Sequence, residues 1–217
     1  MPVTINGDGT ISGLAVGGLP DGSVDADSIA ANAVTNAKIS GMAASKLTGA
    51  LPAISGASLT GLTGGITNID QWYLSSQQDL TTADPLTGWT RSNNQVFFAV
   101  EGSAMTESSG VFSFPSTGMW LVSFSCWYYA NARSSRWMQS RIKATTDNSS
   151  YSQVCDASNG IYNTGSNGYN SSYSQFIFDV TNTSNCKVRF AVDSQNTLQY
   201  MAGRNFTNGK FIRLSDT

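Results

Sequence analysis

The sequence predicts an all-β protein in two parts, an extended segment over residues 1–65 and a β-sandwich or jelly roll over residues 66–217. Two observations carry this prediction. Every aromatic residue of the 217-residue chain lies at or after Trp72, so only the second part has the side chains for an aromatic core. In that part, short runs alternate apolar and polar residues, which is the period of a strand with one buried side.

The first part has an internal repeat. Gly, Ala, Ser and Thr make up more than half of it. One aliphatic residue recurs every five positions, at Leu19, Val24, Ile29, Val34 and Ile39. A spacing of five matches neither the period of a helix nor that of a strand, and it indicates a pentad-like repeat. We expect these five residues to form the contacts of a shaft or of an assembly.

The first part holds too little apolar surface to fold alone. Its larger apolar side chains are few, mostly Val, Ile and Leu, and their burial cannot offset the conformational entropy of ordering the whole segment. It therefore either packs on other copies or on a partner, or it stays a flexible tether. The regular spacing favours an ordered shaft or docking arm, and residues 25–39 also allow one or two weak helical turns. The Gly-rich stretch at residues 63–65 is the expected hinge.

In the second part, four runs predict strands with one inward face. The inward residues are Trp120, Val122, Phe124, Cys126 and Tyr128; Met138, Ile142 and Ala144; Phe176, Phe178 and Val180; and Cys186, Val188, Phe190 and Val192. Polar clusters at residues 145–148, 163–168, 181–185 and 207–209 predict turns between strands. We expect the cysteines to pack as small apolar residues, and their spacing leaves a single disulfide open.

The residue inventory argues against an enzyme. The chain has no histidine, which excludes Ser-His-Asp and Cys-His catalysis and histidine-ligated metal sites. Its three cysteines form no CxxC pair. The acidic cluster of residues 21–27 does not fit a calcium loop, because Ala30 and Asn36 stand where an EF-hand needs Gly and Glu. We expect no catalytic residues, no cofactor and no metal.

Charge and hydropathy reduce the range of partners that we expect. No apolar run is long enough for a membrane span, and Met1 to Gly13 has no basic region followed by an apolar core. With 12 basic residues and a net charge of −2, the chain lacks the signature of general nucleic-acid binding. We expect neither membrane insertion nor a nucleic-acid partner, and free thiols in a reducing compartment.

Residues 145–175 contain the strongest binding signal. Four tyrosines, Tyr151, Tyr162, Tyr169 and Tyr173, lie among Ser, Asn and Gly, the composition of adaptable recognition loops. We expect them to form a receptor-contact loop, and burial in strands or at an interface between copies is the alternative. The basic residues Arg133, Arg136, Arg141 and Lys143 cluster nearby.

Two stretches of the second part resemble the C1q/TNF-like jelly rolls. Residues 110–124 place Phe112, Pro115, Gly118 and Trp120 in the Phe-x-x-Pro-x-x-Gly-x-aromatic pattern of that family, which leads into a long inner strand. Residues 205–214 are similar to its last strand. The resemblance implies a jelly roll over residues 66–217 and, since the family is typically homotrimeric, a trimer.

The first part resembles the repeats of bacteriophage fibre proteins. Residues 22–39 are similar to their Gly-Ser-Val/Ala-Val-Thr-x-Ala-Lys-Leu repeats, and residues 51–62 to the neck before a fibre's head. These fibres are typically homotrimers as well. The resemblance implies a virion protein, made in the host cytoplasm and located on the tail or the capsid surface.

Together these patterns predict a non-enzymatic, short trimeric tail fibre of a phage. Residues 1–65 would dock on baseplate or capsid proteins of the virion, and the jelly roll would contact a glycan or protein on the host surface. Because 217 residues is short for a tail fibre, a capsid decoration (cement) protein is the alternative. Its N-terminal arm would staple neighbouring capsid subunits.

Overall fold

The computed structural model describes residues 65–92, 100–132, 134–162 and 165–217, together with residues 4–5, 7–8, 11–12, 29–31 and 33–35 of the first part. The chain divides into two units, Met1–Thr60 and Gly61–Thr217. The boundary expected after residue 65 stays a prediction. Below, the second unit is called the head.

In the first unit, the described residues form a small hairpin and one turn. Strand β1 (Thr4–Ile5) pairs antiparallel with β2 (Ile11–Ser12). The backbone N–H of Ala33 donates to the carbonyl of Ala30, which closes a single turn. Of the five pentad residues, Ile29 and Val34 are described and both are exposed, at 43% and 56%. Leu19, Val24 and Ile39 lie outside the described residues, so their role as assembly contacts stays a prediction.

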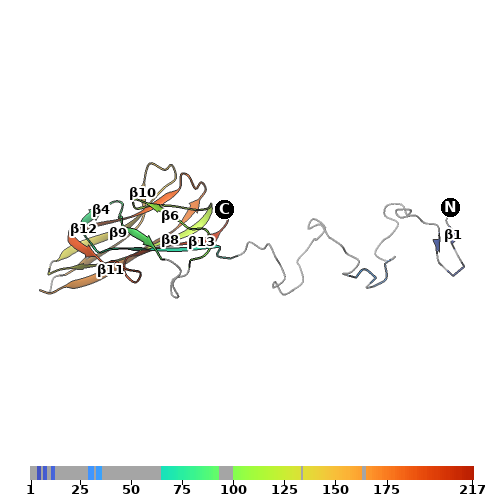
Figure 1. Cartoon of the computed structure of the whole chain (residues 1–217), viewed down its shortest axis with the longest axis horizontal. Coiled ribbons are helices and arrows are strands. Elements are labelled where there is room, and N and C mark those ends of the chain that lie inside the picture. Colours follow the sequence, from blue (N-terminus) through green and yellow to red (C-terminus); the bar gives the residue numbers. More distant parts are fainter. Residues whose placement is uncertain are drawn as a thin grey trace. The chain divides into compact units, whose positions relative to one another are not determined.

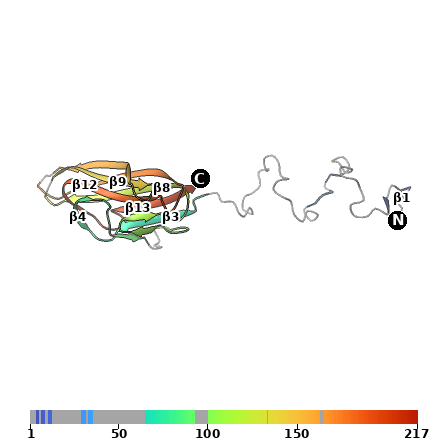
Figure 2. The ribbon, with the colours of Figure 1, turned by 90° about the horizontal axis from the view of Figure 1, so that it is seen from above.

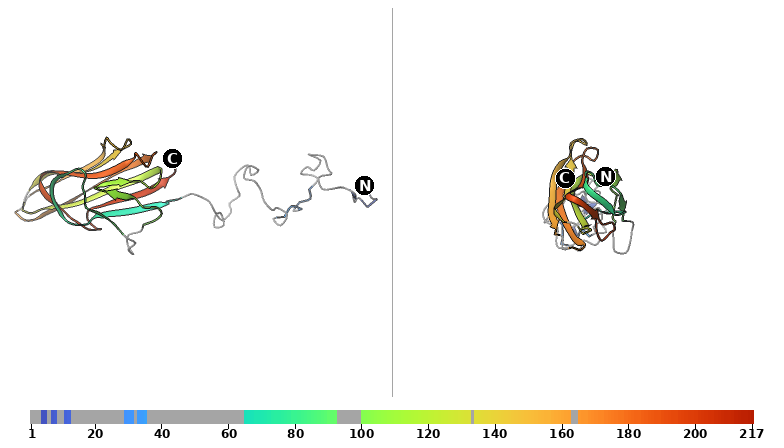
Figure 3. Two further views of the ribbon diagram at one scale, coloured as in Figure 1. Left: turned by 45° about the horizontal axis from the view of Figure 1, so that its top comes forward. Right: turned by 90° about the vertical axis from the view of Figure 1, so that its left-hand side faces the viewer.

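The head is all-β, with no helix among its described residues. Its strands run along its long direction in two layers (Figure 3). In spatial order, the first layer contains β5 (Trp89–Arg91), β3 (Asn68–Leu74), β13 (Asn208–Ser215), β8 (Gly118–Ala130) and β11 (Gly168–Val180). In the second layer, β10 (Ser152–Ile161), β9 (Ser135–Thr145) and β12 (Lys187–Tyr200) are neighbours.

Short strands complete the second layer and join it to the first. The free side of β12 is shared by β7 (Val111–Ser113) and β4 (Gln78–Ala83), and β6 (Thr106–Ser108) pairs with β7. At its end, β12 also pairs with β8, where Gln199 is opposite Tyr129 and Tyr200 is opposite Tyr128. This pairing connects the layers, so the sheet is nearly a closed barrel. All strand pairs are antiparallel.

The core confirms the predicted alternation. Every residue predicted to point inward on β8, β9 and β12 is buried, and on β11 Phe178 and Val180 are buried while Phe176 is half-buried. The rings of Phe124 and Phe190 stack with centroids 4.6 Å apart, and Phe211 packs beside them, 6.0 Å from Phe190. The aromatic core therefore bridges the two layers.

The strand–turn–strand motif at residues 110–124 has the predicted form. β7 ends at Ser113, a turn follows, and the 13-residue β8 begins at Gly118. Gly118 has a φ of +131°, and a Cβ there would lie 2.5 Å from the carbonyl oxygen of Ser215. Only glycine fits this start of the long strand, because a side chain would meet the backbone of β13.

The predicted turn at residues 207–209 is wrong. β13 already begins within this stretch, and the turn comes earlier, where the backbone N–H of Phe206 donates to the carbonyl of Gly203. Gly209 serves packing instead, because a Cβ there would lie 2.4 Å from the ring of Phe190. The glycine suggested a turn, but its small size is needed to accommodate a buried ring on the neighbouring layer.

A buried carboxylate holds the start of the head together. Asp70 on β3 is 1% exposed. Its side chain forms an ion pair with Arg91, 2.8 Å from Nε, and accepts a hydrogen bond from the backbone N–H of Met105 at 2.8 Å. It also accepts the backbone N–H of Gln71. This carboxylate links β3, β5 and the segment before β6. Its charge is compensated by the Arg91 guanidinium and by the two backbone N–H groups.

Candidate functional site

The head has a chain-entry end and an opposite end, called here the far end. Asn68 of β3 is paired with Arg213 of β13, so residue 65 and the C-terminus lie at one end (Figures 1 and 2). At the far end, β8, β10 and β12 end and β9 and β11 begin. Three surface hollows lie at the far end.

The first hollow, called here the Tyr129 hollow, has a volume of about 270 Å³ and is lined by Asp79, Tyr129, Asn131, Thr197 and Gln199. Strand register explains why these residues meet. Asp79 on β4 is opposite Gln199 on β12, which is opposite Tyr129 on β8. Neighbouring side chains on one face of antiparallel strands are in contact distance. The hollow thus joins a carboxylate, two amides, a hydroxyl and a phenol.

The second hollow, of about 290 Å³, is lined by Tyr73, Gly203, Arg204, Asn205 and Phe206. The guanidinium carbon of Arg204 lies 5.0 Å from the centre of the Tyr73 ring. The Phe206 ring packs edge-on against Trp127, with centroids 5.6 Å apart. Aromatic side chains and one cation therefore shape this hollow.

The third hollow, of about 500 Å³, is lined by Ser134, Ser135, Arg136, Gly160, Ile161 and Tyr162. It lies where β9 begins and β10 ends, since Ser135 is opposite Ile161. Tyr162 is 87% exposed, the highest exposure among the large apolar and aromatic side chains described. The third hollow therefore combines a basic residue with an open aromatic ring.

The four predicted tyrosines do not form one loop. Tyr169 and Tyr173 point outward from strand β11, at 60% and 56% exposure, and only Tyr162 and Tyr151 lie outside strands. Residues 169–175 belong to strand β11 and expose Tyr169, Tyr173 and Gln175. Because the stretch is rich in Asn, Ser and Tyr, its composition suggested a loop instead of a strand. Whether any of the four contacts a receptor stays a prediction.

Two of these tyrosines are engaged in ring contacts within the head. The guanidinium carbon of Arg189 lies 4.1 Å from the centre of the Tyr151 ring, so this ring is part of a cation–π pair. Tyr169 stacks on Tyr129, with centroids 5.3 Å apart and ring planes at 30°. Tyr173 donates a hydrogen bond from its hydroxyl to Gln175. Tyr169 thus belongs to the surroundings of the Tyr129 hollow, and Tyr151 does not.

The outward side of the first layer is apolar near the chain-entry end. We call the outward side of β3, β13, β8 and β11 the aliphatic face. One row crosses it, because Ile69 is opposite Ile212, Ile212 is opposite Leu121, and Leu121 is opposite Ile177. Ile177 is 55% exposed and the other three are half-buried. Four aliphatic side chains in contact across four strands form a continuous apolar stripe.

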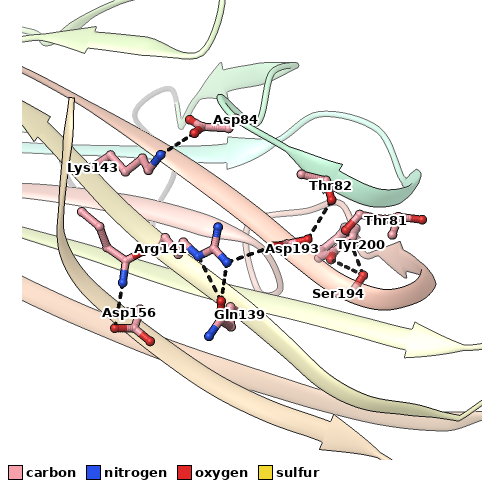
Figure 4. Close-up of polar contacts among 11 residues, drawn as sticks. Thr81, Thr82, Asp84, Gln139, Arg141, Lys143, Asp156, Asp193, Ser194 and Tyr200 are labelled. Carbon is pink, nitrogen blue, oxygen red and sulfur yellow. Dashed lines mark hydrogen bonds and ion pairs between the residues drawn. The ribbon is translucent and has the colours of Figure 1, made fainter. Parts of the chain in front are cut away.

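The outward side of the second layer is charged. We call the outward side of β10, β9, β12 and β4, with Asp84 beside it, the charged face. Asp84 pairs with Lys143, 2.5 Å from Nζ, and its other oxygen lies 2.9 Å from Nε of Arg189, although that N–H is not aligned for a hydrogen bond. Figure 4 shows the neighbouring pair, in which Arg141 contacts Asp193 at 3.0 Å and also Gln139.

These ion pairs show that part of the basic cluster found in the sequence is paired with carboxylates. Arg141 and Lys143, two members of the cluster found in the sequence, are neutralised by Asp193 and Asp84. Arg136 lines the third hollow, and Arg133 lies outside the described residues. The cluster is thus divided between a compensated strand face and the far end.

The surroundings of two carboxyl groups, those of Asp193 and Asp147, lower their pKa values. For Asp193, burial is the largest single influence and would raise the pKa, but hydrogen bonds from Thr82 and Arg141 outweigh it and lower the pKa. The pKa of Asp147 is lowered strongly, first by the Thr145 hydroxyl and then by the backbone N–H groups of Ser150 and Ser149. Both carboxylates stabilise local structure, Asp147 in the turn after β9 and Asp193 on the charged face.

The three cysteines are free thiols. Cys126 and Cys186 are buried, and burial raises the pKa of the Cys126 thiol, so it stays protonated. Cys155 on β10 is half-buried. Over the described ranges, no three His, Cys, Asp or Glu residues gather as metal ligands. No helix in the described part of the chain is long and apolar enough to span a membrane.

Comparison with known proteins identifies the fold. No protein-family model and no curated protein sequence matches the chain. Among solved structures, the head is similar to the Eiger TNF of S. frugiperda, with a TM-score of 0.53 and 14% identity over 70% of this chain and 95% of that one. It is also similar to murine APRIL at pH 5.0, with a TM-score of 0.51 and 11% identity over 68% and 98%. The head is therefore a TNF-like jelly roll, as the motif at residues 110–124 predicted.

Only some of the residues that line the Tyr129 hollow could be predicted from the sequence. On β8, inward Tyr128 implies outward Tyr129, so the signal for that residue was present. Asp79 and Gln199 carried no signal, because they are far apart in the chain and meet only through the register of β4 with β12.

Proposed function

We propose that this chain is a non-enzymatic structural protein of a phage virion, a short trimeric tail fibre. Residues 1–65 dock on the virion, and the TNF-like head contacts the host surface. The observation that carries the proposal is the polarity of the head. The chain enters at one end, while the three hollows lie at the far end, where an attached head would present them.

The aliphatic face supports the trimeric part of the proposal. Its row of Ile69, Ile212, Leu121 and Ile177 spans all four strands and leaves apolar area that a second copy would cover. Because three of these side chains are already half-buried and Ile177 is 55% exposed, covering them contributes only part of the about 1.5–3 kcal/mol that complete burial of each would give. The trimer implied by the C1q/TNF-like and fibre resemblances gives this face its partner. Sedimentation of the full chain at micromolar concentration tests the trimer, and a single monomeric species contradicts it.

The composition of residues 1–65 supports the docking part. A small-residue repeat with one aliphatic residue in five needs a partner surface, and the described members Ile29 and Val34 are exposed. We therefore expect deletion of residues 1–65 to leave a folded head that no longer attaches to particles. Attachment by the truncated head at the level of the full chain contradicts the docking role.

Location on the particle separates the tail fibre from its alternative, a capsid decoration protein. Electron microscopy of particles labelled with gold-conjugated antibody against the head distinguishes the two. Label confined to the tail supports the fibre, label over the capsid supports the decoration protein, and unlabelled particles contradict a virion role.

A further inference from the structure

We propose that the Tyr129 hollow binds one uncharged sugar ring of a host-surface glycan. This inference rests on the proposed function and names the class of ligand for its receptor contact. The hollow combines an aromatic ring with a carboxylate, two amides and a hydroxyl, from Asp79, Tyr129, Asn131, Thr197 and Gln199. The residues come from three strands and the segment after β8, and the barrel closure brings them together.

The aromatic ring of the hollow is held in place by its neighbours before any ligand binds. Tyr129 is half-buried and stacks on Tyr169, which is its partner in the register of β8 with β11. Together with Gln199 and Asp79, these residues form one row across β4, β12, β8 and β11. An aromatic side chain held in place offers an apolar surface for the C–H groups of a sugar ring at little cost in conformational entropy.

The polar part of the hollow matches the hydroxyl groups of a sugar. The Asp79 carboxylate is exposed and, among the described residues, has neither an ion pair nor a hydrogen bond, so both oxygens are available to accept. Gln199 Oε1 is buried without a hydrogen-bond partner, although buried acceptors are normally satisfied. The Thr197 hydroxyl is hydrogen-bonded to that of Thr81 at 3.1 Å, which holds it in position.

The same residues disfavour other ligands. The hollow has a single carboxylate and is not part of a group of three metal-ligating side chains within the described chain, which argues against a cation. No basic residue is among those that line it, which argues against phosphate or an acidic sugar. Its volume of about 270 Å³ is just below the about 300–1,000 Å³ of sites for drug-sized ligands, so it suits one ring.

The hollow is compatible with a trimer that uses the aliphatic row. Tyr129 and Leu121 lie on the same strand, eight residues apart. At about 3.4 Å per residue they are separated by about 27 Å. An interface centred on the row near the chain-entry end therefore leaves the far end for a ligand.

Saturation-transfer NMR on the full chain tests the inference directly. The probes are the methyl glycosides of glucose, galactose, mannose and N-acetylglucosamine at millimolar concentration. We expect transfer to at least one of them, with affinity at least about tenfold lower in Asp79→Ala and in Tyr129→Ala, the equivalent of about 1.4 kcal/mol. The inference is overturned if no glycoside shows transfer, or if transfer is unchanged in both variants.

A matched variant on the same face controls for indirect effects. Asp179→Ala removes an exposed aspartate at the other end of β11, and it should bind the sugar like the unmodified chain. Circular dichroism verifies that Asp79→Ala is folded, since the exposed Asp79 makes no described contact that its loss would break.

Binding of the labelled full chain to host cells separates this inference from the proposed function. If the chain binds cells and binding falls in Asp79→Ala, both are supported. If it binds cells equally with Asp79→Ala and Tyr129→Ala, the sugar assignment fails and the adhesion role stands. If it binds neither cells nor particles, the proposed function itself fails, whatever the NMR result.

Discussion

The two outward faces of the head differ although both cover the same core. The aliphatic face has a row of four apolar side chains, Ile69, Ile212, Leu121 and Ile177, with no charge within the row. The charged face instead pairs Asp84 with Lys143 and Arg189, and Asp193 with Arg141. Folding requires only the inward side of each strand to be apolar. The outward residues are therefore free to differ between the faces, and the apolar row is the surface that the proposed trimer would bury, while the charged face suits contact with water.

The largest effect should come from the core that both faces share. Phe190 is fully buried, stacks on Phe124 and fills the space left by Gly209. We expect Phe190→Ala to lower the free energy of unfolding by about 3–5 kcal/mol, because it leaves a cavity. Urea denaturation measures it.

The control for that variant lies on the aliphatic face. Ile177→Ala truncates a side chain that is 55% exposed, and in the monomer it should cost less than about 1 kcal/mol. Equal losses in the two variants would mean that the outward row contributes to the fold itself, and the assignment of this row to association would be wrong.

A charge placed in the aliphatic row should break association without unfolding the head. Leu121 lies in the middle of the row, between Ile212 and Ile177. We expect Leu121→Arg to weaken self-association at least about tenfold, because three copies would bury unpaired cations. Sedimentation measures it. Gln153→Arg, on an exposed position of β10 on the charged face, should leave association unchanged. Equal weakening by both would contradict the distinction between the faces.

On the charged face, removal of one shared carboxylate should give a moderate loss. Asp84→Ala leaves Lys143 and Arg189 without their partner, and the three side chains are only 20–28% exposed. We expect a loss of about 1–2 kcal/mol, between the values of exposed and buried pairs. Thermal or urea denaturation measures it. Asp216→Ala, which removes the exposed partner of Arg213, should cost less than about 0.5 kcal/mol.

The smallest expected effect is a pH dependence from Asp193. Its pKa is lowered in the folded head, so its contribution to stability is present above the unfolded value of about 4 and is lost as the pH falls through the lower, folded value. The difference in unfolding free energy between the unmodified chain and Asp193→Asn should therefore narrow as the pH falls below about 4. Urea denaturation at several pH values tests this, and a difference that widens on acidification contradicts it.

The regular strands of the head could be predicted from local patterns. In the run from Trp120 to Tyr128 every second residue is apolar, and burial of these inward residues follows from the strand period. The same alternation predicted β9, β11 and β12. By contrast, β3 to β6 had no clear pattern, because they are short and β4 exposes or half-exposes every residue. β3 pairs with β13 and β4 pairs with β12, and these partners are distant in the sequence.

The contacts of the candidate site were even less predictable from local sequence patterns than the strands. Tyr169 was found from composition, but as a loop residue, and its stacking on Tyr129 became visible only with the register of β8 and β11. Tyr151 was found in the same way and is instead covered by Arg189. Composition finds residues suited to binding, whereas their neighbours across strands decide which of them are free to bind.

By itself, the sequence determined that this is an all-β head preceded by a small-residue repeat, and which side of the long strands is buried. These properties depend on local periodicity and composition, which neighbouring residues carry. Only the tertiary structure decided the strand order, the closure of β12 on β8, and with them the aliphatic row and the Tyr129 hollow. The reason is physical: register joins residues as distant as Asp79 and Gln199, and no local pattern encodes a pairing over that separation.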